Sequence, residues 1–132
     1  MSLAAPIGPA VLARTAIVDA LRTVAGLNVY ATAPDSPVAF DAFPRWAVTN
    51  YVGGRLSSLA VHEYDAIVVL PAGYEPDTVA QGDSLLDLVA SALLAVGEVQ
   101  AADPISLTFQ AGSAVPALRV RIVPHLNSQQ VP

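Results

Sequence analysis

The segment from Thr78 to Val96 constrains the fold more strongly than any other part of this sequence. It contains no proline, and its apolar residues recur with the period of an α-helix, about 3.6 residues. One apolar face consists of Leu85, Val89, Ala92, Leu93 and Val96, and a second strip beside it consists of Leu86, Ala90 and Leu94. Because only a narrow arc around Asp87, Ser91 and Ala95 is left for water, we expect this helix to be buried on two sides.

The composition of the chain bears on which surface covers the second apolar strip. At 132 residues the chain has the size of one domain, yet 54% of its residues are apolar and only 13% are charged. The mean hydropathy is +0.53, whereas a small domain normally needs more charge to cover its large surface. Either the first helix or a proline-bearing loop covers the strip, or the strip is an interface between subunits. The apolar surplus favours the interface.

The remaining patterns predict one further helix and four to five strands. A helix fits residues 10–24 between Pro9 and Gly26, with an apolar face made of Ala13, Ile17, Ala20, Leu21 and Val24. Strand-like patterns occupy residues 27–31, 45–52, 61–71, 105–110 and 117–125. The sequence therefore predicts an α+β fold, a twisted and mostly antiparallel sheet of four to five strands with two helices packed on it, in the order α-β-β-β-α-β-β. Residues 1–9 are interpreted as an N-terminal arm, 10–126 as a single domain and 127–132 as a C-terminal tail.

A loop between the first two strands carries apolar side chains among prolines. The chain runs through Pro34, Pro37 and Pro44, and Val38, Phe40 and Phe43 lie between these prolines. Prolines limit the shapes of a loop, which lowers the entropic cost of presenting side chains to a neighbour. The loop is therefore a candidate contact surface, and the alternative is that its phenylalanines fold back as a lid on the core. The sequence leaves both open.

Few residues suggest catalysis. The chain has no cysteine and no lysine, which excludes a disulfide framework, a cysteine nucleophile, a phosphate-loop lysine and a Schiff base. In "HEYD", Glu63 and Asp65 share one face of a strand and His62 lies on the other. With His125, these residues could bind a metal ion or perform acid–base chemistry. The favoured interpretation is an exposed strand end with solvated charges, and no cofactor is expected.

Other conspicuous side chains have structural interpretations. Trp46 stands at the start of a strand and is expected to be a core anchor. Arg119 and Arg121 share a face of the last strand and could pair with Glu63 and Asp65 across the sheet.

Charge and hydropathy narrow the classes of partner. The net charge is −5 and all six basic residues are arginines, so the chain lacks the basic stripe that nucleic-acid binding needs. No segment has the pattern of a signal peptide or a membrane span, so we expect a soluble protein.

In their order and amino-acid sequence, several segments resemble those of the tail terminator proteins of long-tailed phages, especially phages of actinobacterial hosts. The first helix ends in "RTVAGLNVY" and is followed directly by the proline-bearing "APDSP" loop and the strand "PRWAVTNYV". Then come the aromatic-then-aliphatic strand "HEYDAIVVLP", the helix "AQGDSLLDLVASAL" and the closing strand "ALRVRIV". These pieces run through most of the chain. The long linker "GGRLSSLA" and the apolar N-terminal arm depart from the family's pattern.

The resemblance implies a non-enzymatic structural protein of the virion. Such a protein forms a hexameric ring that caps the tail tube, ends its polymerisation and offers a surface to the head-tail connector. It is assembled in the host cytoplasm, and DNA passes through it without specific binding. Another neck, head-tail joining or tail-completion protein is the alternative. The expected subunit or partner interface comprises Leu86, Ala90, Leu94, Val38, Phe40, Phe43, Gly53, Gly54 and Arg55, and the expected channel-facing acids are Glu63 and Asp65.

Overall fold

The computed structural model describes residues 9–52, 58–71, 76–108, 114–124 and 129–131. It contains two helices and six strands. Their bounds are α1 Pro9–Arg22, β1 Asn28–Val29, β2 Asp41–Val52, β3 Ser58–Val69, α2 Pro76–Leu94, β4 Gly97–Thr108, β5 Ala114–Pro124 and β6 Gln129–Val131.

The strands form one sheet in the order β1-β2-β3-β5-β4, with β6 added to β3. The short β1 runs parallel to β2, and every other pairing is antiparallel. The predicted α+β class, with two helices on a mostly antiparallel sheet and the order α-β-β-β-α-β-β, is confirmed. The sequence did not predict β6, which lies in the expected C-terminal tail and pairs with residues 58–60 of β3.

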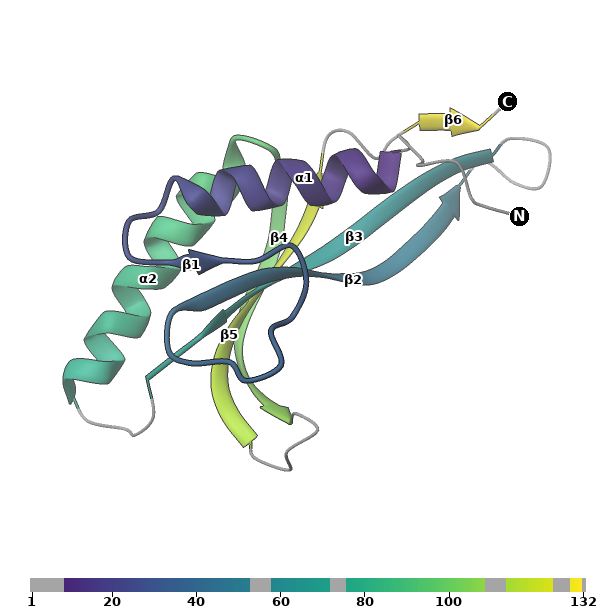
Figure 1. Cartoon of the computed structure of the whole chain (residues 1–132). Helices are drawn as coiled ribbons and strands as arrows, with labels where there is room; N and C mark the ends of the chain where they lie inside the picture. Colours follow the sequence, from purple (N-terminus) through teal and green to yellow (C-terminus); the bar gives the residue numbers. More distant parts are fainter. Residues whose placement is uncertain (1–8, 53–57, 72–75, 109–113, 125–128, 132) are drawn as a thin grey trace.

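Both helices pack on the same face of the sheet (Figure 1). The predicted core face of the first helix is confirmed, since Ala13, Ile17, Ala20 and Leu21 on α1, and Val24 just after its end, are at most 7% exposed. From α2, Leu85, Val89 and Leu93 are buried against it, and the sheet contributes Tyr64, Ala66, Val68, Leu118, Val120 and Ile122. Burying each large aliphatic side chain contributes about 1.5–3 kcal/mol, so this cluster is the main source of stability.

A second, smaller apolar cluster consists of Phe43, Ile67, Leu107 and Ala117, with Ile105 and Val115 packed against it. In the register of the sheet, Phe43 lies opposite Ile67, and Ile105 lies opposite Ala117. These residues alternate along their strands with the residues of the main core, so they occupy the face of the sheet without helices.

The loop before β2 is held by a buried carboxylate. Asp41 is 2% exposed; its Oδ2 accepts from the Val38 backbone N–H at 2.9 Å and its Oδ1 from Asn28 Nδ2 at 3.3 Å. Phe40 has a φ of 70°, in the left-handed region that non-glycine residues rarely adopt. Its N–H donates to Val69 O at 2.7 Å and its carbonyl accepts from Asn28 N–H at 3.0 Å, which holds this conformation in place.

Strand β2 begins at Asp41, earlier than the predicted residue 45, because its hydrogen-bonding pattern tolerates Pro44. Ala42 O accepts from Tyr30 N–H on the β1 side, so Pro44, two residues later, also turns its nitrogen away from β3. The missing N–H therefore costs no bond in the β2–β3 ladder. The Pro44 carbonyl on that side accepts from Arg14 Nη1 at 3.1 Å.

Strand β4 is much longer than the predicted residues 105–110. It pairs with β5 from Gly97 to Thr108, with a register shift between Val99 and Ala101. Among the described strands β4 has no other neighbour, and an edge position accommodates Pro104, which the sequence pattern treats as a strand breaker.

The turn from α2 into β4 requires glycine at position 97. A Cβ on Gly97 would lie 2.7 Å from the Cα of Pro124 and closer still to the carbonyl oxygen of Val123. We expect Gly97→Ala to lower the free energy of unfolding by about 3 kcal/mol, the upper end of the range for overpacking, because both obstacles are backbone. The measurement is urea unfolding followed by circular dichroism.

Gly26→Ala is the matched control. Gly26 has a φ of 91° and open space around its Cβ position, so alanine there costs only the left-handed backbone, about 1–2 kcal/mol. A loss for Gly97→Ala no larger than that for Gly26→Ala would show that β4 shifts freely at this contact.

Candidate functional site

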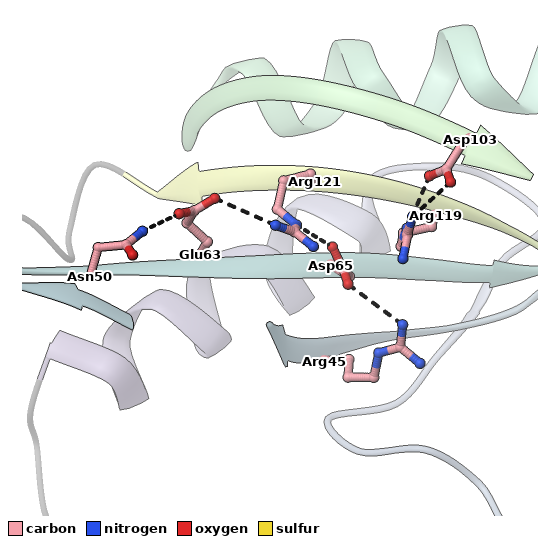
Figure 2. A network of polar contacts seen from close by, with 7 residues as sticks. All are labelled: Arg45, Asn50, Glu63, Asp65, Asp103, Arg119 and Arg121. Atoms are coloured by element: carbon pink, nitrogen blue, oxygen red, sulfur yellow. Dashed lines mark hydrogen bonds and ion pairs between the residues drawn. The ribbon is translucent and has the colours of Figure 1, made fainter. Parts of the chain in front are cut away.

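A row of charged side chains crosses the helix-free face of the sheet on three neighbouring strands. Asp65 on β3 lies opposite Arg45 on β2 and opposite Arg121 on β5. Arg121 Nε donates to Asp65 Oδ1 at 2.6 Å, and Arg45 Nη2 lies 3.5 Å from Asp65 Oδ2. Figure 2 shows the carboxylate of Asp65 between the two guanidinium groups.

Further pairs extend this row into a network. Arg121 Nη1 lies 3.5 Å from Glu63 Oε1, and the other oxygen of Glu63 accepts from Asn50 Nδ2. Two residues before Arg121 on β5, Arg119 forms a two-point contact with Asp103 on β4. Its Nε donates to Asp103 Oδ1 at 2.9 Å and its Nη2 to Asp103 Oδ2 at 2.7 Å (Figure 2). We call Arg45, Asn50, Glu63, Asp65, Asp103, Arg119 and Arg121 the ion network. Its three arginines balance its three carboxylates.

Burial makes Asp65 the central member of the network. Its side chain is 3% exposed, whereas those of Arg45 and Arg121 are 44% and 30% exposed. A buried carboxylate needs paired, hydrogen-bonding cations, and both arginines reach it from opposite sides. The hydrogen bond to Asp65 raises the pKa of Arg121 above its ordinary value, so this guanidinium stays charged.

The Arg119–Asp103 pair responds to acid. The hydrogen bond from Arg119 holds the pKa of Asp103 below its usual value. A lowered pKa in the folded state means that the pair stabilises the fold above the unfolded-state pKa, about 3.9, and loses this effect as the pH falls through the folded value.

These contacts correct part of the sequence interpretation. Glu63 and Asp65 do share a face, and the predicted pairing with Arg121 is confirmed. Asp65 does not face solvent, so its assignment as a solvated charge or a channel-facing acid is wrong. Arg119 bonds to Asp103 rather than to Glu63 or Asp65, because Asp103 lies directly opposite it on β4.

The residues of the metal or acid–base hypothesis have other partners. His62 Nδ1 lies 2.7 Å from Thr49 Oγ1, on the opposite face of β3 from Glu63 and Asp65. In the described part of the chain, no group of three or more His, Cys, Asp or Glu side chains is placed to hold a metal ion. His125 lies outside the described residues.

The expected interface residues differ in their exposure in the structure. Leu94 and Val38 are each 60% exposed and free to meet a partner. Leu86 and Phe40 are partly buried against the main core, and Ala90 is half-buried. Phe43 is 3% exposed in β2, so its assignment to a contact surface is wrong and the alternative, folding back on the core, holds for it. Gly53, Gly54 and Arg55 lie outside the described residues.

Trp46 is not the expected core anchor. It lies opposite Tyr64 in the β2–β3 register, yet it is 57% exposed. Its Nε1 donates to Thr49 Oγ1 at 2.9 Å, and the same hydroxyl contacts His62. The sequence position of Trp46 could not reveal that the helices leave this part of β2 uncovered.

Arg14 is another residue that sequence reasoning missed. Its Nη1 donates to the carbonyls of Ala31 and Pro44, at 2.7 and 3.1 Å, and its guanidinium carbon lies 5.6 Å from the centre of the Tyr64 ring. Burial raises the pKa of Tyr64. Arg14 therefore joins α1 to the loop and to β2, and only its place on the polar side of α1 could have drawn attention to it.

Two shallow cavities flank α1. The first, of about 460 Å³, is lined by Val11, Arg14, Thr15, Val18, Asp19, Arg22, Ala31 and Tyr64. The second, of about 420 Å³, lies between the end of α1 and α2 and is lined by Thr23, Val24, Ala25, Leu88, Ser91 and Ala92. Leu88 on the rim of the second cavity is 55% exposed.

No protein-family model matches the chain, and a search of curated proteins finds no significant match. Among the described residues no helix is long and apolar enough to cross a membrane.

Neutralising Asp65 tests the ion network. We expect Asp65→Asn to lower the free energy of unfolding by about 2 kcal/mol, less than the 3–5 kcal/mol typical of a fully buried pair because both arginines are partly solvated. Chemical denaturation of the wild type and the variant measures the difference.

Asp103→Asn is the control, because it removes the same charge from an exposed pair on the same face. Its midpoint should change less than that of Asp65→Asn. Equal effects would mean that burial of Asp65 does not set the strength of the network.

Proposed function

We propose that this chain is a structural assembly protein of the phage tail terminator type, which forms a ring at the head-proximal end of the tail tube. The observation that carries the proposal is the exposure of large apolar side chains at separate places on one small domain. Trp46, Leu88, Leu94 and Val38 are all between 55% and 60% exposed. A chain with 13% charged residues that exposes such groups is suited to contacts with other protein chains.

The places of these residues favour a ring. Leu88 and Leu94 lie on α2, whereas Trp46 lies in the middle of β2, so the exposed apolar residues belong to different elements. Contacts that join two different surfaces of identical subunits are heterologous, and they close into a ring when the rotation between subunits allows it.

The ion network fits passage of DNA without binding. Four of the six arginines are paired with carboxylates, Arg22 on α1 and Arg45, Arg119 and Arg121 on the helix-free face. The helix-free face therefore offers little free positive charge to phosphate groups, and the chain as a whole carries −5. The composition and the sequence resemblance support the same assignment.

Mass measurement tests the proposal. We expect multi-angle light scattering to detect a ring of this chain, either alone or after mixing with the major tail tube protein of the same virus. The ring should also stop the growth of tube polymers seen by electron microscopy. Binding to connector protein without any effect on tube length would favour another neck or head-tail joining protein. A monomer that ignores both proteins would contradict the proposal.

The α2 helix offers a second test. Leu94→Asp should leave the circular dichroism spectrum and the unfolding midpoint nearly unchanged while preventing ring formation, because Leu94 is 60% exposed. Leu86→Asp should instead destabilise the monomer by about 2–3 kcal/mol, because Leu86 packs against the main core. A Leu94→Asp variant that assembles normally would exclude this part of α2 from the interface.

A further inference from the structure

Trp46 is presented as a rigid apolar anchor. The single polar atom of its side chain, Nε1, already donates to Thr49 Oγ1, and that hydroxyl is held in turn by His62 Nδ1 at 2.7 Å. A partner that covers the indole therefore removes apolar surface from water without leaving an unpaired N–H. Because the hydrogen bonds already restrict the ring, less side-chain entropy is lost on binding. Such features are typical of the residues that dominate protein interfaces.

The first cavity, which is lined by the sheet partner of Trp46, combines apolar surface with positive charge. This partner, Tyr64, lines the cavity with Val11 and Arg14. Val11 is 43% exposed. Arg14 is bonded to carbonyl oxygens, and none of the described carboxylates forms an ion pair with it. We call Val11, Arg14 and Trp46 the tryptophan patch.

A surface of complementary character lies on α2. Leu88, 55% exposed, stands on the rim of the second cavity, and the exposed Asp87 precedes it. The last turn of α2 contains no basic residue. This shallow cavity of about 420 Å³ offers apolar surface from Val24, Ala25, Leu88 and Ala92, against which one face of an indole ring can pack. We call Asp87, Leu88 and this cavity the α2 patch.

We propose that the tryptophan patch of one copy binds the α2 patch of the next, with the indole of Trp46 entering the cavity beside Leu88. The charges agree, because Arg14 has no carboxylate partner among the described residues and the exposed Asp87 directly precedes Leu88 of the cavity lining. The first turn of α1 and the helix α2 lie at opposite ends of the helix layer (Figure 1). One copy therefore can use both patches at once, as a ring requires. This inference rests on the self-association in the proposed function and assigns the surfaces that make it.

The chain provides its own probe, because Trp46 is its only tryptophan. In dilute monomer we expect red-shifted fluorescence that acrylamide quenches readily. Under conditions that yield the ring, emission should shift to shorter wavelength and quenching should fall. Leu88→Asp should weaken assembly by more than about tenfold in dissociation constant and leave Trp46 quenchable. Trp46→Ala should weaken assembly to a similar extent, with the monomer's circular dichroism unchanged.

Tyr30→Ala is the control matched to Trp46→Ala, since Tyr30 is an exposed aromatic residue, 43%, outside both patches. It should assemble with the same fluorescence shift as the wild type. A ring in which Trp46 stays quenchable, or that Leu88→Asp leaves intact, would overturn the assignment of surfaces and leave the proposed function standing. A wild type that forms no oligomer, alone or with tube protein, would overturn both.

Discussion

The carboxylate of Asp65 sets the main constraint on this fold. It sits in the central part of β3, with 3% of its side chain exposed, on the face that the helices leave uncovered. A buried charge of this kind is tolerated only when cations reach it with good geometry. Strands β2 and β5 must therefore flank β3 in the one register that brings Arg45 and Arg121 to it. A slip by one residue would move every side chain of a strand to the opposite face.

The same register also aligns the two apolar clusters. Phe43 meets Ile67 two residues away from the Arg45–Asp65 pair, and Ala66 and Val68 turn to the helices on the other face. On one face β3 thus carries core residues, and on the other it carries Glu63 and Asp65 followed by the buried Ile67 and Val69. Specific ionic pairing supplies a directional preference that the apolar contacts lack.

The sequence was informative where structure follows from neighbours along the chain. Helix periodicity placed Ile17, Leu21, Val89 and Leu93 in the core, because side chains three and four residues apart share a face of a helix. Strand alternation likewise placed Glu63 and Asp65 together. The features that could not be predicted depend on segments that are distant in the sequence. Burial of Asp65 requires two other strands, and exposure of Trp46 depends on where the helix layer ends. The sequence pattern did not predict most of β4, because the strand contains polar residues and Pro104. An edge strand is largely exposed, so it needs no regular apolar alternation.

The long edge of β4 has a consequence for how copies of this chain can meet. A free strand edge normally invites another strand to add to it, and repeated addition leads to open-ended fibres. In β4 Pro104 removes one backbone donor, and the bulge between Val99 and Ala101 interrupts the regular ladder. Both features discourage strand addition. They therefore lower the tendency of these chains to aggregate through this edge at high protein concentration. Association then depends on side-chain contacts, which have a defined geometry and can stop at a finite number of subunits.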